Sequence, residues 1–315
     1  MMPLFRCSKN GARRLNLLRF RSEKDLQTLI EHNLETIFGA RLVATEFSTG
    51  AKHAGRIDSL ALDENENPVI IEYKLVESSD LVNQSLFYLS WLDDHKADFE
   101  LAARKRLGEN LEIDWDKIRV ICIAPGFKKY DLHAVGMIGA NIELWQYQLY
   151  DGDLVSLEKV FPKANSDIAS IGNKKNEKKN PVMVEAGKKA AETRRTAVHS
   201  FEQHLSGKDV AVVELVKSIR DFSLGLAETV EESPKKFYIA YKVSQNFLCV
   251  EVQKKKVSLF LKLDPKLCGK LPSNARDVSK IGHYGTGDVE LTITSHDELE
   301  SSKDWIRRAF ENVGG

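Results

Sequence analysis

The amino-acid sequence predicts an α/β protein in which a mixed sheet is sandwiched by helices, followed by a smaller α+β domain. Three observations lead to this prediction. Helical periodicity and short β-rich apolar runs alternate over the first 150 residues. The stretch 163–198 loses both patterns and becomes rich in Lys, Asn and Ala. After residue 199, predicted helices stand at both ends of a run of predicted strands.

The first predicted helix covers residues 22–38. Ser22 precedes Asp25 by three positions, which is a capping signal for the start of a helix. Gly39 favours termination at the other end. Apolar residues at helical spacing define its inward face: Leu26, Leu29, Ile30, Ile37 and Phe38.

A β-hairpin is predicted next, because the polar turn 64–68 separates two apolar, β-rich runs at 57–63 and 69–75. The same criteria predict elements on both sides of this hairpin. They are a strand at 42–47, helices at 81–92 and 95–107, and strands at 118–124 and 142–150.

The loss of pattern in the middle of the chain sets the domain boundaries. We divide the chain into a first domain at 1–162, a basic flexible linker at 163–198 and an accessory α+β domain at 199–315. The linker is rich in lysine, and such a run can follow a nucleic-acid backbone, although most are simply solvated. The last domain is expected to hold helices at 201–205, 209–224 and 296–312 and strands at 237–242, 246–253, 256–262 and 288–294.

The composition excludes several classes of protein. No run of 18 apolar residues exists, so a membrane-spanning helix is not expected. The four cysteines are scattered without metal-ligand spacing, which is typical of a protein of the reducing cytoplasm, where we expect this one to be located. The 46 basic and 46 acidic residues cancel, so a nucleic-acid partner would have to meet a local basic surface.

One local basic stretch opens the chain, since the first 22 residues hold six basic residues and no acid. Such a beginning is compatible with an organellar targeting segment or with a basic arm that contacts phosphate. We favour the plainer interpretation, a first strand with solvated basic side chains. The residues concerned are Arg6, Lys9, Arg13, Arg14, Arg19 and Arg21.

The run VIIEYKL at 69–75 carries the chemistry of the first domain. Side chains alternate on a strand, so Glu72 and Lys74 face the same way from an apolar run. Charged groups on a buried strand are costly unless they are paired or bind something. The hairpin register brings Asp58 opposite residues 72 to 74, so two carboxylates and a lysine converge. These oxygen ligands suit Mg²⁺, whereas the plainer alternative is a salt bridge between Asp58 and Lys74.

Further sequence elements surround this hairpin in order. GRID ends at Asp58, Glu72-Tyr73-Lys74 follows behind an apolar run, and Gln84 and Tyr88 form a Q-x-x-x-Y pattern in the next helix. Together these elements resemble the motifs of the PD-(D/E)xK nuclease superfamily, in particular of RecB-like and NucS-type endonucleases. The motif match covers about residues 22–90, and the fold pattern extends to about residue 150. One departure is an isoleucine before the hairpin aspartate, where the name-giving motif has proline.

The resemblance implies a restriction-endonuclease-like fold and a metal-dependent nuclease that hydrolyses phosphodiesters, in DNA before RNA. It further implies an endonuclease in repair, restriction or defence. Asp58 and Glu72 are implied to hold Mg²⁺ or Mn²⁺, and Lys74 to orient the attacking water and stabilise developing charge. Gln84 and Tyr88 are implied to position the phosphate or a flanking base.

The resemblance also implies an acid from the helix before the hairpin. Glu23 shares the inward stripe of that helix and is preferred over Glu31 and Glu35, which fall to its side. The helix dipole alone would favour an acid at this position. Glu46 on the intervening strand remains open as an alternative. Arg56 shares the strand face of the hairpin aspartate, where it contacts phosphate or pairs with an acid such as Glu46.

Residues 199–315 resemble an uncharacterised domain that accompanies such nucleases and is sometimes labelled a predicted transport protein. This resemblance implies no mechanism, and a transport role is weakened by the lack of a membrane segment. The main alternative to a nuclease is a non-catalytic nucleic-acid-binding module with the same fold, against which the complete acid–acid–lysine set speaks. The expected partner is nucleic acid, DNA first, with no membrane, and a homodimer stays open.

Overall fold

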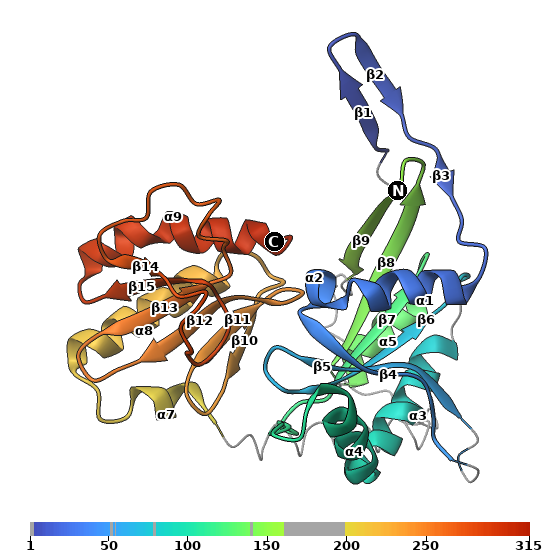
Figure 1. Ribbon diagram of the computed structural model, residues 1–315, viewed down its shortest axis with the longest axis horizontal. Coiled ribbons are helices and arrows are strands. Elements are labelled where there is room, and N and C mark those ends of the chain that lie inside the picture. The colour runs from blue at the N-terminus through green and yellow to red at the C-terminus, as the bar shows by residue number, and fades with distance from the viewer. Residues whose placement is uncertain (1–2, 51–52, 54, 78–79, 139–140, 161–198) are drawn as a thin grey trace, which may run out of the picture. The chain divides into compact units, whose positions relative to one another are not determined.

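The computed structural model describes residues 3–50, 53, 55–77, 80–138, 141–160 and 199–315 (Figure 1). These residues fall into two compact units. Unit 1 holds the described residues up to 160, except two short segments at 35–40 and 63–65. Unit 2 holds those two segments together with the chain from residue 199 onward. The predicted linker at 163–198 lies outside the described residues.

Unit 1 is built on a mixed seven-stranded sheet in the order β3-β8-β7-β6-β5-β4, with β9 paired to β8. The contacts of β6 with β7 and of β7 with β8 are parallel, and β5 with β6 is antiparallel. This unit therefore has the mixed α/β architecture that the sequence predicts. The strands are β3 (Leu17–Leu18), β4 (Ala40–Ser48), β5 (Arg56–Asp63), β6 (Pro68–Tyr73), β7 (Arg119–Ala124), β8 (Ile142–Tyr150) and β9 (Leu154–Val160).

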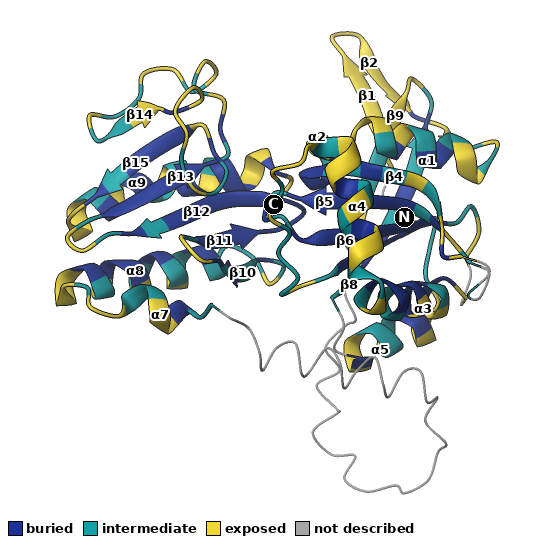
Figure 2. Ribbon diagram, turned by 60° about the horizontal axis from the view of Figure 1, so that its bottom comes forward, coloured by how far each residue is buried: buried dark blue, intermediate teal, exposed yellow. Residues whose placement is uncertain are grey.

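Strand β6 lies in the interior of this sheet, with β5 on one side and β7 on the other. All of its residues are buried (Figure 2). The residues of β7 are buried as well. A run of Val and Ile suits this place because both faces of such a strand are covered by helices. Ile70 on one face belongs to a core with α3 (Asp80–Asp94) and α4 (Lys96–Leu107). The hairpin predicted around the turn 64–68 is confirmed.

The predicted helix over 22–38 is two helices, α1 (Glu23–His32) and α2 (Leu34–Phe38). The capping prediction at its start is confirmed, since the Ser22 hydroxyl accepts the backbone N–H of Asp25. The break falls at Asn33, which leaves helical geometry and whose side chain donates to the Leu29 carbonyl. Asparagine competes for backbone partners in this way, and helical periodicity in the sequence did not reveal it.

The sequence also left some elements of unit 1 unpredicted. The basic N-terminal stretch, expected to form a single strand, forms a hairpin of β1 (Phe5–Ser8) and β2 (Gly11–Arg14) followed by β3. Helix α5 (Lys129–Ile138) and strand β9 were not expected. Their residues are mostly partly exposed, so the apolar pattern that marks a buried element is weak there.

Unit 2 is rich in sheet. Its strands form one antiparallel six-stranded sheet in the order β10-β11-β12-β13-β15-β14, with helices before and after the strands in the chain. The short strands β10 (Glu231–Pro234) and β14 (Ala275–Asp277) were not predicted. The other elements match the sequence prediction in type and order: α7 (Phe201–Leu205), α8 (Val210–Leu224), β11 (Ile239–Lys242), β12 (Asn246–Val252), β13 (Val257–Leu261), β15 (Val289–Ile293) and α9 (His296–Asn312).

Two further expectations concern the whole chain. Among the described residues, no helix is both long enough and apolar enough to cross a membrane. The four cysteines are all free, and Cys122 and Cys249 are buried as small core residues. Both findings agree with the composition of the sequence.

Candidate active site at the end of the central hairpin

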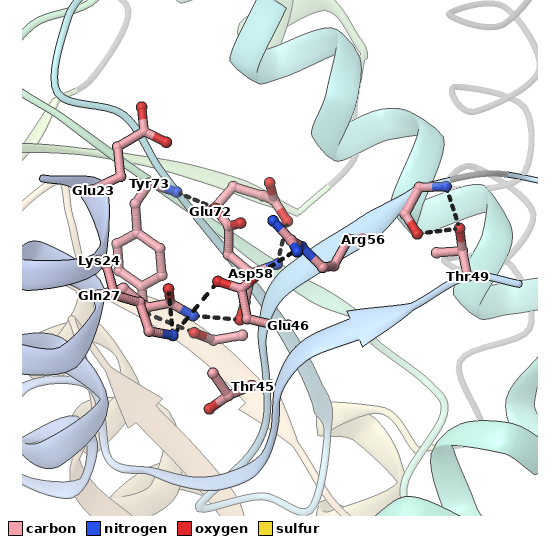
Figure 3. Close-up of polar contacts among 12 residues, drawn as sticks. Glu23, Lys24, Gln27, Thr45, Glu46, Thr49, Arg56, Asp58, Glu72 and Tyr73 are labelled. Atoms are coloured by element: carbon pink, nitrogen blue, oxygen red, sulfur yellow. Dashed lines mark hydrogen bonds and ion pairs between the residues drawn. The ribbon is translucent and has the colours of Figure 1, made fainter.

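Two carboxylates meet where β5 begins and β6 ends (Figure 3). The pairing of Ser59 with Ile71 continues by one step to place Asp58 beside Glu72. The backbone N–H of Asp58 donates to Glu72 Oε1 at 3.1 Å, and the backbone N–H of Tyr73 donates to Asp58 Oδ2 at 3.1 Å. Each carboxylate is thus held by the other residue's strand, and the convergence predicted from the hairpin register is present.

The two carboxylates differ in burial and in how many partners they have. Glu72 is fully buried and Asp58 is partly exposed. Glu72 Oε2 is buried without a hydrogen-bond partner among the described residues. Burial, followed by the nearby charge of Asp58, raises the pKa of Glu72 to about 9. Burial also raises the pKa of Asp58, against the backbone hydrogen bond from Tyr73 and the charge of Lys74, which lower it.

Lys74 follows the last residue of β6 and completes the predicted set. Its backbone N–H donates to the Ile123 carbonyl of β7, which extends the sheet contact by one residue. Its ammonium lies 3.6 Å from a carboxylate oxygen of Glu23 at the start of α1. The charge of Lys74 opposes the upward pKa shifts of both Asp58 and Glu72, so it acts on both carboxylates. The structure pairs Lys74 with Glu23 and not in the simple Asp58–Lys74 salt bridge.

The donor set fits a hard divalent cation. Mg²⁺ is usually bound through one or two carboxylates, with waters and substrate phosphate as the remaining ligands. Asp58 and Glu72 supply two such carboxylates, and the unpartnered Glu72 Oε2 is a buried acceptor that such a cation would satisfy. Within the described part of the chain, no cluster of three or more His, Cys, Asp or Glu side chains could hold a metal. This excludes a closed all-protein cage there but not an open two-carboxylate site.

A polar network beneath Asp58 was missed by sequence analysis. Gln27 on α1 is buried, and its amide donates to the Asp58 carbonyl at 2.7 Å and to Glu31 Oε1 at 2.9 Å. The same Glu31 oxygen accepts a hydrogen bond from the Ser59 hydroxyl at 2.6 Å. The Ser59 hydroxyl also contacts the Tyr73 hydroxyl at 3.1 Å. The signal available in the sequence was a Gln and a Glu four residues apart on one helix face.

Arg56 and Glu46 form an ion pair beside the hairpin, with Arg56 Nε 2.5 Å from Glu46 Oε2. Of the two alternatives for Arg56, pairing with Glu46 is the one the structure contains. Lys24 lies 3.5 Å from the other carboxylate oxygen of Glu46. Glu46 itself has a φ of 53°, which turns its strand locally. Its negative charge contributes to the raised pKa of Asp58.

The Q-x-x-x-Y pair supports the start of β5. The Gln84 amide donates to the Tyr88 hydroxyl at 3.1 Å, and that hydroxyl also accepts the backbone N–H of Arg56 at 3.2 Å. Tyr88 is buried. Gly55 lies against its ring, because an added Cβ would stand 2.9 Å from a Tyr88 ring carbon. The glycine of the GRID motif is therefore required by close packing.

These geometries define a class of site: two carboxylates on adjacent strands of a sheet, with a lysine directly after the second strand. A protein of Haemophilus influenzae (strain ATCC 51907 / DSM 11121 / KW20 / Rd), described as "Uncharacterized protein", is 30% identical over 322 residues. The match covers 99% of this chain and 100% of the relative. The chain belongs to the family of that protein.

Other similarities concern parts of the chain. The family described as "Domain of unknown function (DUF5655)" matches residues 201–313, within unit 2. A solved structure described as "Structure of EndoMS-dsDNA2 complex" is 21% identical, with a TM-score of 0.31, over 42% of this chain and 47% of its own. A repair endonuclease from Pyrococcus abyssi is 20% identical, with a TM-score of 0.27, over 41% of this chain and 48% of its own. This chain thus spans about half the length of both structures, and at these scores neither similarity bears on its function.

Proposed function

We propose that unit 1 is a restriction-endonuclease-like domain that hydrolyses phosphodiester bonds of DNA with the help of Mg²⁺ or Mn²⁺. The observation that carries this proposal is the meeting of Asp58 with a buried Glu72 that has one carboxylate oxygen without a partner among the described residues. Two adjacent carboxylates of this kind are stable together only with a shared proton or a bound cation. A bound cation would neutralise both carboxylates and satisfy the Glu72 oxygen that lacks a partner among the described residues, which a salt bridge between Asp58 and Lys74 would not do.

Each residue of the cluster has a role in this proposal. Asp58 and Glu72 hold the cation, which when bound supplies electrophilic assistance at phosphate and a more acidic water. Lys74, partly exposed next to both carboxylates, orients the attacking water and stabilises the negative charge that develops on the phosphate. Glu23 holds the Lys74 ammonium beside the two carboxylates and would extend the acidic shell only after a side-chain movement, since the described residues contain no group of three acids placed to bind one ion.

The flanking residues orient the site. Tyr88 fixes the backbone at Arg56, two residues before Asp58, and Gln84 fixes the Tyr88 hydroxyl. Gln84 is partly exposed and is the member of the pair that remains accessible for a phosphate or a flanking base. Arg56 is exposed and would exchange Glu46 for a phosphate group when substrate arrives. Unit 2 is an accessory domain in this proposal, joined through residues 163–198.

The proposal is tested by a cleavage assay on single-stranded, duplex and branched DNA with Mg²⁺, Mn²⁺ or EDTA. Asp58→Ala and Lys74→Ala are compared with wild type and with Glu109→Ala and Lys105→Ala, which remove the same charges from exposed positions near the end of α4. Cleavage that needs the metal, is lost in the first pair and survives in the second supports the nuclease. Cleavage that persists in Asp58→Ala or Lys74→Ala overturns it.

The second candidate, a non-catalytic binding module, is separated by the same experiment. Tight DNA binding without cleavage under any metal, with equal binding by wild type and Asp58→Ala, would favour the module. One observation favours catalysis. A module that only binds DNA does not need a fully buried Glu72 beside a second acid, with one carboxylate oxygen that has no partner among the described residues.

A further inference from the structure

The N-terminal hairpin of β1 and β2 stands clear of the sheet of unit 1 (Figure 1). Every residue of both strands is exposed, and the hairpin is coloured as exposed throughout (Figure 2). An isolated two-stranded hairpin is at best marginally stable in water, because it buries almost no apolar surface. A hairpin of this kind contributes little to the core, so packing within the fold does not account for its basic side chains.

The two faces of the hairpin have different surroundings. The strand register pairs Arg6 with Arg13 on one face, and Phe5 with Arg14 on the other. Arg13 on the first face forms a salt bridge of 2.9 Å with Asp151 in the turn between β8 and β9. The first face is therefore directed at this turn, whereas the second is not.

Gly152 follows Asp151 in the turn and lets the guanidinium of Arg6 approach the backbone closely. An added Cβ on Gly152 would lie 2.4 Å from the guanidinium of Arg6, and its φ of 79° is already in the left-handed region. The amide of Asn16 also donates to Asp151 at 3.0 Å. The Arg6 and Arg13 face is therefore fixed against the β8–β9 turn, and the hairpin is held at a defined place on unit 1.

The opposite face and the tip carry cations that the fold does not neutralise. Lys9 sits in the two-residue turn at the tip, and Arg14 lies on the outer face beside Phe5, which is 54% exposed. Neither Lys9 nor Arg14 has an ion pair with a described residue. The first 22 residues contain no acid that could supply one locally. Unpaired cations on a protruding ribbon favour a polyanionic partner.

The chain runs from this hairpin directly to the candidate active site. Strand β3 pairs with β8, Phe20 packs edge-on against Tyr147 at 5.5 Å, and α1 then begins at Glu23. Arg19 and Glu23 act in opposite directions on the raised pKa of the Tyr147 hydroxyl, which places both near the same ring. Basic side chains thus continue from the hairpin to the residue that pairs with Lys74.

From this arrangement we infer that the β1–β2 hairpin is a DNA-binding arm, which contacts the phosphates of duplex DNA beside the cleavage site through Lys9 and Arg14. This inference rests on the proposed nuclease function, whose substrate it specifies as a duplex that extends beyond the cleaved bond. A two-stranded ribbon fits the major groove, and the arm's basic side chains contact phosphate without reading sequence.

The test is the salt dependence of binding to a short fluorescent DNA duplex, measured by anisotropy in EDTA so that no cleavage occurs. The arm variant is Lys9→Ala with Arg14→Ala. The matched control is Lys105→Ala with Arg106→Ala, which removes two exposed cations from the last turn of α4. Loss of two phosphate contacts lowers the slope of log K against log salt by about 1.8 and weakens binding on the order of 10- to 60-fold at low salt.

The outcomes separate the arm from the proposed function. A smaller slope in the arm variant, with the control unchanged and with unaltered thermal unfolding, supports the arm whether or not the wild type cleaves DNA with Mg²⁺. Equal slopes in the arm variant and wild type overturn the arm, even if cleavage occurs. Failure of the wild type to bind duplex DNA overturns the arm, whereas the proposed function is overturned only if single-stranded and branched DNA are not cleaved either. Binding with no cleavage under any metal overturns the nuclease alone.

Discussion

Two buried glutamates on the same sheet, Glu72 on β6 and Glu143 on β8, have opposite surroundings. Glu143 accepts from Arg119 Nε at 2.6 Å and Nη2 at 3.1 Å and from the indole N–H of Trp145 at 2.9 Å. The ammonium of Lys159 lies 3.6 Å away. Glu72 instead faces Asp58, a group of the same charge, and leaves one oxygen without a partner among the residues that the structure describes.

This difference in surroundings distinguishes a buried charge that stabilises the fold from one that belongs to a candidate binding site. A buried ion that is fully paired needs nothing from outside the protein, although it adds little net stability compared with an apolar replacement. A buried ion with a like-charged neighbour and a vacant acceptor is stable only when it takes up a proton or a cation. Glu143 is therefore explained by its partners in the fold, whereas Glu72 is left to take up a proton or a cation. Substitutions at the two positions should fail in different ways.

The largest effect is expected from Asp58→Asn, which keeps the shape of the side chain and removes its charge. Because the cation would lose the negative charge of one of its two carboxylate ligands, we expect cleavage of DNA with Mg²⁺ to fall by about 10³-fold or more. The protein should stay folded, since the amide oxygen of the new side chain still accepts the Tyr73 N–H. The matched control is Glu143→Gln, which should cost stability but leave the folded fraction active. Cleavage by Asp58→Asn within tenfold of wild type would refute the assignment.

The second largest effect is expected at the paired glutamate. Arg119→Leu removes the main partner of Glu143 and leaves a buried charge, which typically destabilises a protein by about 3–5 kcal/mol. Chemical denaturation monitored by circular dichroism measures this loss. Arg119→Leu combined with Glu143→Leu removes both charges and should recover most of the stability. A single variant as stable as wild type would show that Glu143 does not depend on Arg119.

The third prediction concerns pH. The folded protein without metal keeps the Glu72 proton up to about pH 9, whereas the unfolded chain loses it near the usual value of 4.5. Unfolding therefore releases a proton between these limits, and this group's stabilising contribution is lost as pH rises through that window. We expect Glu72→Gln to gain stability over wild type in EDTA, by up to ~1.4 kcal/mol for each pH unit.

The effect of added Mg²⁺ on thermal unfolding provides a second test of this prediction. Mg²⁺ should raise the unfolding temperature of wild type and do so more at pH 8 than at pH 6, because binding releases the Glu72 proton. The Glu72→Gln variant should show a smaller response to Mg²⁺ at both values. Parallel stability curves for wild type and variant from pH 5 to pH 9 would contradict the raised pKa of Glu72.

The sequence predicted the structure best where strand alternation and hairpin register pointed to the same residues. Strand alternation and hairpin register were enough to bring Asp58, Glu72 and Lys74 together, because both follow from fixed backbone geometry. The interior position of β6 followed from its unbroken apolar run. The roles of these residues remain proposals, since geometry brings groups together without showing what they do.

Sequence reasoning was weakest where polar groups pack against polar groups. The helix was treated as one continuous unit with an apolar inward face, so Glu31 was placed to the side and Gln27 was not considered. In the structure that polar side of α1 faces β5 and forms hydrogen bonds with the strand. The N-terminal hairpin was expected to be a single strand for a related reason, because a hairpin without alternating apolar residues lacks the usual signal around its Lys9–Asn10 turn.

The smallest predicted effect tests whether this network positions Asp58. Glu31→Ala leaves the Gln27 amide and the Ser59 hydroxyl without their shared acceptor, which costs about 1–3 kcal/mol of stability. If the network also holds the Asp58 carbonyl, cleavage should fall by about three- to tenfold, with a matching rise in the Mg²⁺ concentration for half-maximal rate. Glu31→Gln keeps an acceptor oxygen at the same place and should restore both cleavage and the Mg²⁺ requirement. If Glu31→Ala loses stability but keeps the same Mg²⁺ requirement, Glu31 only stabilises the fold and does not position Asp58. The difference between Glu72 and Glu143 would then lie only in the groups that contact each glutamate directly.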